Sequence, residues 1–275
     1  MYGTSLDDMI SSSISRYFPP SISNSLRFFP ESVFGNIEDK VIQETVASLV
    51  ETGLAVLPMR IPNATIDLLR SNIIFHPSKT ARSDALESEL LAIPTIKSLW
   101  LDSILLQVAE LYFDSTPILD FVYASRTVKF FDESEATKEH DAQQWHFDKD
   151  RIKFLKVFIY LTDVEKENGP HEFLQCPHRS PPGYDGRLTD EFVKKKYGDS
   201  LQILVLGPAG TVFIEDTHGL HRGTPVFGDP REVLQFEYCN SLFGEVYPRL
   251  PLDFFSFQFP NLVKHFPRLF HRFLP

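Results

Sequence analysis

The stretch Gln144–Leu161, QWHFDKDRIKFLKVFIYL, decides our interpretation of the fold. Its two ends, 144–147 and 155–161, are strand candidates, because they are short runs of aromatic and aliphatic residues on either side of a charged connection. Five more candidates of this kind follow along the chain: 172–176, 203–205, 211–215, 223–226 and 233–239. Turn residues separate them, such as the Asn-Gly-Pro at 168–170. Many short strands with this punctuation favour an antiparallel sandwich or barrel.

Helical patterns dominate the chain before these strands. Upstream, apolar residues at helical spacing predict helices that end at stop signals such as Gly53, and short runs of apolar or aromatic residues predict strands. They are helix 36–52, strand 54–58, helix 64–73, a long helix 94–111 and strand 119–131. Segment 75–90 is polar and predicts no clear element. Two later helices are expected, 190–197 inside a polar insertion and 261–274 at the C-terminus, where Pro267 would kink or split the helix.

The predicted fold class is mainly β with supporting N-terminal helices. No flexible linker marks the change of character near residue 117, so we expect a single domain over residues 1–275. Its expected parts are an irregular arm 1–35 that drapes over the core, helical support 36–116, a jelly-roll core 117–245 and a C-terminal tail or helix 246–275.

Composition limits the classes of function. The 37 acidic and 27 basic residues give a net charge of −10, which argues against a general nucleic-acid binder. The two cysteines, Cys176 and Cys239, form no CxxC pair, and this favours a reducing, cytoplasmic location. No stretch resembles a secretory signal or reaches the length of a membrane span. The expected partner is therefore a small molecule, with no nucleic acid and no membrane, and the oligomeric state stays open.

The candidate chemistry begins with His146 and Asp148. On a strand, residues two apart project from the same face, so the imidazole and the carboxylate would converge. A structural His–Asp hydrogen bond is the simpler interpretation of such a pair in isolation. A third ligand could come from His218 or His221, and the sequence pattern leaves both open. Two histidines and one carboxylate are the ligand set of non-heme Fe(II) oxygenases.

Arg231 lies ten residues after His221, beyond a Gly-Asp-Pro turn. A strand that returns past a metal would carry an arginine at about this distance, where its rigid, permanently charged guanidinium suits the far carboxylate of a dicarboxylate cosubstrate. A surface charge after a turn is the alternative.

Seven pieces between about residues 40 and 240 resemble, in order and spacing, the phytanoyl-CoA dioxygenase-like branch of the Fe(II)/2-oxoglutarate oxygenases. They are Gly53–Pro58, Trp145–Asp148, Lys156–Val164, Asn168–Pro170, Cys176–Ser180, Gly210–Ile214, and Asp216–Gly223 together with Arg231.

The resemblance implies a double-stranded β-helix, a distorted and cupin-like jelly roll. It implies Fe(II) on His146, Asp148 and His221, 2-oxoglutarate held at its far carboxylate by Arg231, and O2 as the oxidant. Related halogenases replace the carboxylate ligand by a small residue, so Asp148 favours hydroxylation of a C–H bond with release of succinate and CO2. The sequence departs from the family at Gly223, where a Ser or Thr is common.

Other polar residues near the predicted site are weaker candidates for a functional role. Lys129 or Arg126 could reach the cosubstrate or an anionic substrate, and an edge-strand surface charge is equally consistent with their positions. His171 and His178 could contact substrate, although stabilisation of a turn is the preferred interpretation.

Two other classes of function compete with an oxygenase. One is a cupin-like protein whose metal does not use 2-oxoglutarate, and Arg231 has no purpose there. The other is a catalytically inactive binding protein of the same fold, which the three intact ligands argue against. A hydroxylase of nucleic acid or protein is less consistent with the acidic balance than one acting on a small molecule.

Overall fold

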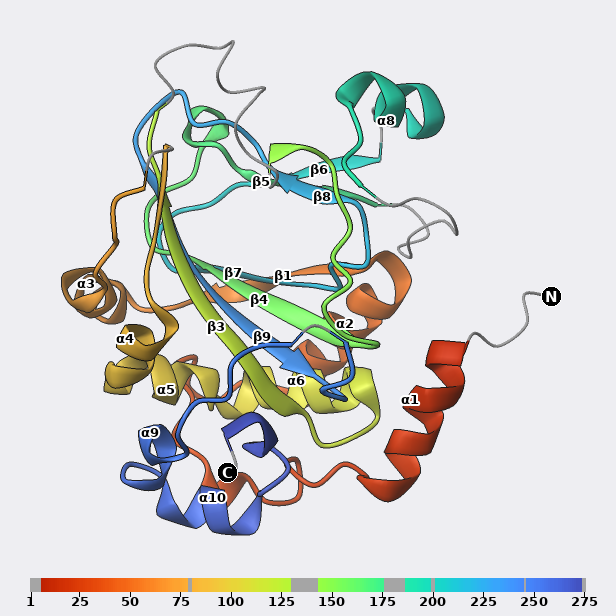
Figure 1. The fold of residues 1–275 in the computed structure, drawn as a ribbon, viewed down its shortest axis with the longest axis vertical. Helices are drawn as coiled ribbons and strands as arrows, with labels where there is room; N and C mark the ends of the chain where they lie inside the picture. The colour runs from red at the N-terminus through yellow and green to blue at the C-terminus, as the bar shows by residue number, and fades with distance from the viewer. Residues whose placement is uncertain are drawn as a thin grey trace.

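The computed structural model describes residues 6–78, 81–129, 143–175, 186–198, 201–244 and 246–273 (Figure 1). The strands are β1 (Leu54–Arg60), β2 (Arg82–Asp84), β3 (Ile118–Thr127), β4 (Phe154–Tyr160), β5 (His171–Leu174), β6 (Gln202–Val205), β7 (Thr211–Glu215), β8 (His221–Gly223) and β9 (Arg231–Cys239). They pair in two antiparallel sheets. The larger has the order β1-β7-β4-β9-β3-β2 and the smaller β6-β5-β8. The prediction of an antiparallel, β-rich core is confirmed.

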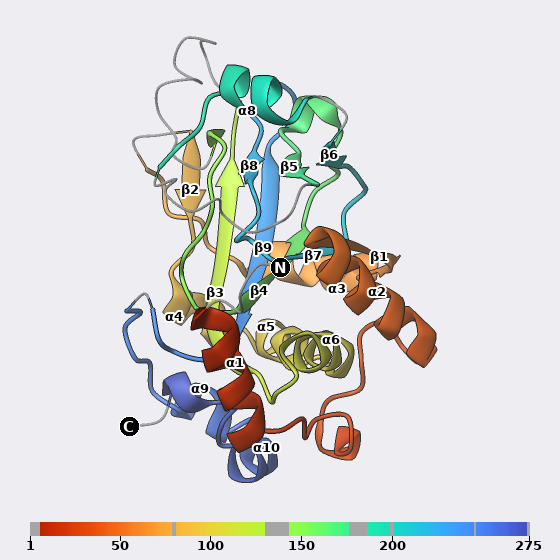
Figure 2. The ribbon, with the colours of Figure 1, turned by 90° about the vertical axis from the view of Figure 1, so that its right-hand side faces the viewer.

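The α-helices are α1 (Leu6–Tyr17), α2 (Asp39–Thr52), α3 (Asn63–Asn72), α4 (Glu87–Ala92), α5 (Pro94–Trp100), α6 (Ser103–Phe113), α8 (Asp190–Tyr197), α9 (Asp253–Ser256) and α10 (Pro260–His265), with short 3-10 turns η1 (Leu26–Phe28), η3 (Lys166–Asn168) and η4 (His271–Phe273). Figures 1 and 2 place α5 and α6 beneath the larger sheet and the smaller sheet on its other side. Among the described residues, no helix is long and apolar enough to cross a membrane.

The larger sheet has one face for the core and one for a pocket. Along β9, Leu234, Phe236 and Tyr238 are fully buried in the cluster that the helices share. The alternate residues Gln235 and Glu237 line the pocket on the opposite face. Side chains alternate along a strand, so β9 supplies both surfaces at once. Each large apolar side chain buried on the helical face contributes about 2 kcal/mol to folding, and this stabilises the sheet that carries the polar face.

The predicted long helix 94–111 is wrong, because the chain forms two helices, α5 and α6, that are interrupted at Asp102. Asp102 has an extended-type backbone and caps α6, accepting hydrogen bonds from the backbone N–H of Ile104 (2.9 Å) and Leu105 (3.5 Å). Its second oxygen accepts from the Ser32 hydroxyl (2.9 Å) and the Val33 N–H (2.9 Å). The apolar residues are spaced as in one continuous helix, but the cap at Asp102 and its contacts with a distant segment end one helix and begin another.

Asp102→Ala is expected to destabilise the protein by about 2–3 kcal/mol, because it removes a helix cap and leaves buried N–H donors without an acceptor. Chemical denaturation followed by circular dichroism measures the change. Asp102→Asn keeps one acceptor oxygen and is the matched control, with a smaller expected loss. Equal losses for both variants would contradict the capping role.

The prediction of an irregular arm over residues 1–35 is wrong for α1, which occupies Leu6–Tyr17. Its sequence, LDDMISSSISRY, contains four serines, and serine competes with helix formation by bonding to the nearby backbone, so local propensity did not indicate a helix. The segment after α1 packs on the core, since Ile22 is fully buried and Phe29 nearly so. The buried carboxylate of Glu110 holds this segment by accepting from the N–H of Ile22 at 2.6 Å.

Other boundaries also differ from expectation. Segment 75–90 contains β2 and the beginning of α4, and α9 precedes the C-terminal helix, which stops at His265, before Pro267. Residues 144–147 make isolated bridges in place of a strand, and the expected strand 223–226 is β8, from His221 to Gly223. Short elements such as these depend on their pairing partners, which local sequence does not specify.

Candidate active site

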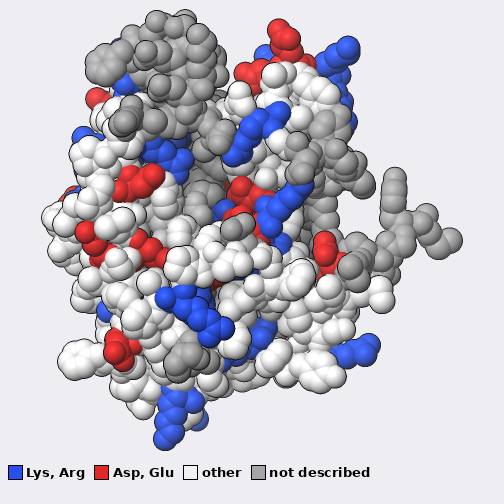
Figure 3. Space-filling view, viewed as in Figure 1, with Lys and Arg blue, Asp and Glu red and all other residues white. Residues whose placement is uncertain are grey.

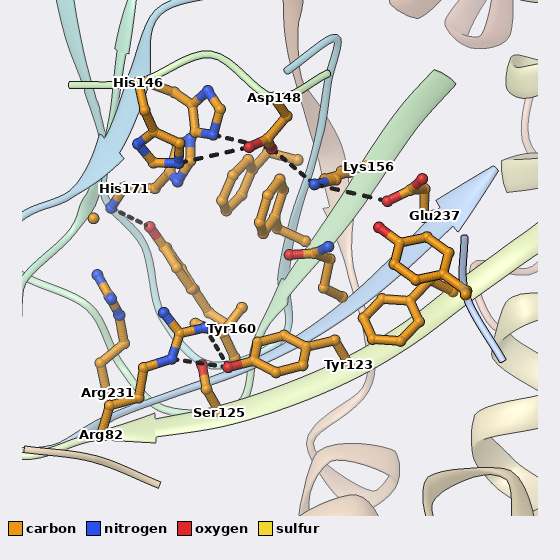
Figure 4. A pocket seen from close by; sticks show the side chains of 18 residues that line it. Arg82, Tyr123, Ser125, His146, Asp148, Lys156, Tyr160, His171, Arg231 and Glu237 are labelled. Atoms are coloured by element: carbon orange, nitrogen blue, oxygen red, sulfur yellow. Dashed lines mark hydrogen bonds and ion pairs between the residues drawn. The ribbon is translucent and has the colours of Figure 1, made fainter. Parts of the chain in front are cut away.

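A pocket of about 350 Å³ lies between the two sheets. β3, β4 and β9 form its floor, and His171 and His221 come from the smaller sheet. In the space-filling view, acidic and basic side chains meet in a hollow near the centre of this face (Figure 3). Figure 4 shows the side chains that converge on the pocket.

His146 and His221 lie directly opposite each other across an antiparallel bridge. Each donates its backbone N–H to the carbonyl of the other at 3.0 Å. Residues paired in this way project to the same side, and the two ring centroids are 4.2 Å apart. The Asp148 N–H donates to the Thr217 carbonyl at 2.8 Å, which ties Asp148 to the segment that leads to His221. His146 and Asp148 therefore converge as their spacing of two predicts, although this segment forms no regular strand.

His146, Asp148 and His221 form a group that could hold a metal ion. One ligand atom from each lies within 4.8 Å of the others. The Nε2 atom of His146 is 3.7 Å from Asp148 Oδ1, and that of His221 is 3.3 Å from Asp148 Oδ2. All three side chains are mostly buried, so little water could reach the ligand atoms and compete with a bound ion for them.

The tautomers of both histidines suit a metal. The Nδ1 atom of His146 is 2.8 Å from the Gln144 carbonyl, and that of His221 is 2.9 Å from the Gly219 carbonyl. A carbonyl oxygen only accepts, so each Nδ1 carries a proton, and in the neutral form of each ring Nε2 presents its lone pair to the cluster.

The two histidines differ in proton affinity. Burial holds the pKa of His146 well below its usual range, and the neighbouring His221 lowers it further. Burial also disfavours the His221 cation, but the carboxylates of Asp148 and Glu215 outweigh it and raise the pKa of His221 to about 8. For Asp148, burial disfavours the charged form, but Lys156 and His221 hold the pKa well below its usual range. Asp148 is therefore a carboxylate at neutral pH.

His218, the alternative third ligand, is occupied elsewhere. Its Nδ1 is 2.6 Å from Asp216 Oδ1, and its Nε2 is 3.1 Å from the Arg151 carbonyl. Asp216 also accepts from the Tyr112 hydroxyl at 2.5 Å. Both ring nitrogens of His218 thus serve a structural network outside the metal group. Geometry favours His221 in the choice that the sequence left open.

Arg231 lies on the pocket wall, and its Nε atom is buried without a hydrogen-bond partner among the described residues. Burial lowers the pKa of its guanidinium. Gly223 makes room for it, since a Cβ atom at residue 223 would lie 2.9 Å from a terminal guanidinium nitrogen of Arg231. The absence of a side chain at residue 223 therefore leaves the space that the Arg231 guanidinium occupies.

A second arginine, Arg82, lines the same end of the pocket. Its Nε donates to the Tyr123 hydroxyl at 2.8 Å and pairs with Asp84 at 3.1 Å. Arg82 lowers the pKa of Arg231 by charge repulsion, after the effect of burial. Two guanidinium groups that repel each other at one end of a pocket favour an anion there.

Lys129 and Arg126, the other cationic candidates, do not line the described pocket. Lys129 is exposed beyond the end of β3. Arg126 is also exposed and pairs with Glu232 at 3.6 Å, on the face of the sheet away from the pocket. The positions of both fit the surface-charge alternative.

His171 begins β5 and lines the pocket, so the turn-stabilising role preferred for it is not what the structure shows. Its Nε2 is 2.5 Å from Glu215 Oε2, and its ring stacks on that of His221 with centroids 5.6 Å apart. Its backbone N–H donates to the Tyr160 hydroxyl at 3.0 Å. His178 lies outside the described residues, as does Cys176. Cys239 is buried and unpaired with another cysteine among the described residues.

Sequence reasoning missed three charged residues of the pocket: Arg82, Lys156 and Glu237. Lys156 is the one charged residue in β4, FLKVFIY, all of which is buried. Glu237 lies six residues after Arg231 on β9, so it shares a face with it. The lone charge in an otherwise apolar strand could have identified Lys156, and the even spacing from Arg231 could have identified Glu237. Arg82 lies in segment 75–90, which carries no such signal.

The structure resembles several solved structures in fold. HygX from Streptomyces hygroscopicus, with nickel and 2-oxoglutarate bound, aligns with a TM-score of 0.53 at 18% identity, over 74% of this chain and 89% of HygX. SnoN, a non-heme alpha-ketoglutarate-dependent epimerase from nogalamycin biosynthesis, gives 0.53 at 17%, over 73% of this chain and 84% of SnoN. AviO1 from Streptomyces viridochromogenes Tue57 gives 0.50 at 16%, over 75% and 97%. No family model and no curated protein sequence matches the chain. At these identities the likeness shows the fold.

Proposed function

We propose that the protein is an Fe(II)- and 2-oxoglutarate-dependent oxygenase that hydroxylates a C–H bond of a small organic molecule. The observation that carries the proposal is the convergence of His146, Asp148 and His221 within 4.8 Å, in a pocket that also contains Arg231. A double-stranded β-helix of the phytanoyl-CoA dioxygenase-like type is part of the proposal. The fold shared with HygX and SnoN, one solved with 2-oxoglutarate and the other named as dependent on it, supports it.

The residues fit the metal and the cosubstrate. Two imidazole Nε2 atoms and one carboxylate are the donor set that non-heme Fe(II) prefers, and three ligands on one side leave positions open. Arg231 would hold the far carboxylate of 2-oxoglutarate, with Arg82 adding positive charge. When bound, Fe(II) and 2-oxoglutarate supply the oxidation of a C–H bond by O2, with release of succinate and CO2.

The protein's own part is orientation and exclusion of water. The Gln144 and Gly219 carbonyls fix the histidine rings through their Nδ1 protons. Phe158 and Phe213 stack at 4.8 Å and line the pocket, where they keep its wall apolar. A low-polarity wall strengthens the charge pairing between Arg231 and a bound carboxylate.

The direct test of the reaction is succinate formation. Protein loaded with Fe(II) without oxygen is mixed with 2-oxoglutarate, exposed to air, and analysed for succinate by NMR. We expect succinate in proportion to enzyme, above the level that free iron produces, even when no substrate is supplied. A cupin-like metal protein that does not use 2-oxoglutarate would bind the metal and form no succinate above that level.

Metal affinity is expected to rise with pH. His221 must be neutral to bind a metal, and because its pKa is about 8, a proton competes with the metal below that pH. The apparent affinity for Ni(II) should increase by about tenfold per pH unit from pH 6.5 to 7.5 and level off above roughly pH 8.5. Chelator-competition titrations at these pH values measure it. In Glu215→Gln the rise should move to lower pH, whereas an affinity independent of pH in the native protein would contradict this assignment.

A further inference from the structure

Lys156 lies in an unusual place for a charge. It is in the middle of β4, in which every residue is buried, and its own side chain is 10% exposed. Transfer of an ammonium group from water into such a site costs several kcal/mol unless carboxylates compensate for it. The cation is therefore held by specific partners.

Three carboxyl groups lie around the Lys156 ammonium, and Figure 4 shows two of them, Asp148 and Glu237. Its Nζ donates to Asp148 Oδ2 at 2.7 Å and to Asp150 Oδ2 at 2.7 Å. Glu237 lies directly opposite on β9, with Oε2 at 3.7 Å from Nζ. Neither carboxyl oxygen of Glu237 accepts a hydrogen bond from the described residues. Burial raises the pKa of this carboxyl well above its usual range, and the Lys156 cation opposes that effect. Burial disfavours the Lys156 cation, but Asp148, Glu237 and Asp150 raise its pKa well above the usual range.

The contact with Asp148 bears on the metal. One oxygen of Asp148 accepts a charge-assisted hydrogen bond, which leaves the other fully available to an ion. A carboxylate restrained at one oxygen binds a metal through the other, whereas a free carboxylate can use both and fill a further coordination position. The ammonium also withdraws electron density from the carboxylate, which makes it a weaker donor to the metal.

We propose that Lys156 is a positioning residue that keeps Asp148 a one-oxygen, weakly donating ligand and so preserves an open coordination position. The inference rests on the proposed function, because it assigns the metal to His146, Asp148 and His221. This role would separate metal affinity from turnover, two properties that usually fall together when a metal site is disturbed. Loss of Lys156 should leave metal binding intact or tighter, because a nearby positive charge has been removed, while turnover falls.

The test compares Lys156→Met, which is similar in size and uncharged, with Lys156→Arg, which keeps the charge. Lys153→Met is the matched control, because Lys153 donates to the Tyr112 carbonyl. With Fe(II) and 2-oxoglutarate under anaerobic conditions, the charge-transfer band of Lys156→Met should move to longer wavelength, since the metal becomes more electron-rich. Its kcat should fall by about 10- to 100-fold, as for other residues that orient metal ligands. Lys156→Arg should keep most of the native band position and kcat. Lys153→Met should change neither the band position nor kcat.

Two outcomes would overturn the inference. One is an unshifted band with normal kcat in Lys156→Met. The other is loss of metal affinity in parallel with kcat, which a merely structural role predicts. Co(II) alone provides an arm that does not need 2-oxoglutarate, since the ligand-field spectrum of bound Co(II) should differ between Lys156→Met and the native protein. If the native protein shows no band with Fe(II) and 2-oxoglutarate but the Co(II) spectra differ, the proposed function fails and the role of Lys156 stands. Identical Co(II) spectra would count against Lys156 alone.

Discussion

His221→Ala is expected to lower the affinity for Fe(II) by about a thousandfold and to abolish enzyme-dependent succinate formation, because a two-ligand site holds a divalent ion poorly. His221 is buried, its Nδ1 proton is fixed by the Gly219 carbonyl, and its Nε2 lies 3.3 Å from Asp148 Oδ2. Removing the ring takes away a donor that the fold has already oriented. Equilibrium titration with Fe(II) under anaerobic conditions measures the affinity, and NMR measures succinate.

His218→Ala is the matched control, three residues away in the turn that precedes β8. Its ring bonds Asp216 and the Arg151 carbonyl, so its loss should reduce stability more than metal binding. We expect the Fe(II) affinity of the folded variant to stay within about threefold of the native value. If His218→Ala lost the metal and His221→Ala retained it, the ligand assignment would be reversed.

Arg231→Gln is expected to raise the KM for 2-oxoglutarate by about 100-fold, since a charge-assisted pair with a carboxylate contributes about 3 kcal/mol. Binding of Fe(II) should remain within about threefold of the native value, because Arg231 is not part of the metal group. Succinate formation as a function of 2-oxoglutarate concentration gives KM and kcat separately. The loss should appear mainly in KM.

Lys129→Ala removes a cation that the sequence offered as another candidate for contact with the cosubstrate. The exposed position of Lys129, outside the set of pocket-lining residues, predicts an unchanged KM. An increase in KM for Lys129→Ala comparable to that of Arg231→Gln would show that the cosubstrate binds at a different end of the site.

Much of the fold could be predicted because it follows from local periodicity. Strands β1, β4, β7 and β9 lie within one or two residues of the predicted ranges. The errors have identifiable causes. The break at Asp102 depends on contacts with Ser32 and Val33, some 70 residues earlier, and no local pattern shows them. Strand β2 is three residues long and exists through its pairing with β3.

The candidate site divides in the same way. His146 and Asp148 could be predicted as a convergent pair, since their spacing of two needs only an extended backbone. The choice between His218 and His221 could not, because it depends on the bridge that sets His221 opposite His146. The pairing of Lys156 with Asp148 joins a buried strand to an irregular segment, so it appears only in three dimensions.

The most direct test of the central claim is the anaerobic addition of Fe(II) and 2-oxoglutarate to the native protein, followed by visible absorption. We expect a charge-transfer band that is absent with Fe(II) alone, absent in His146→Ala, and weakened in Arg231→Ala at the same 2-oxoglutarate concentration. No band in the native protein, at concentrations of both that saturate a site of ordinary affinity, would contradict the assignment of His146, Asp148, His221 and Arg231 to an oxygenase centre.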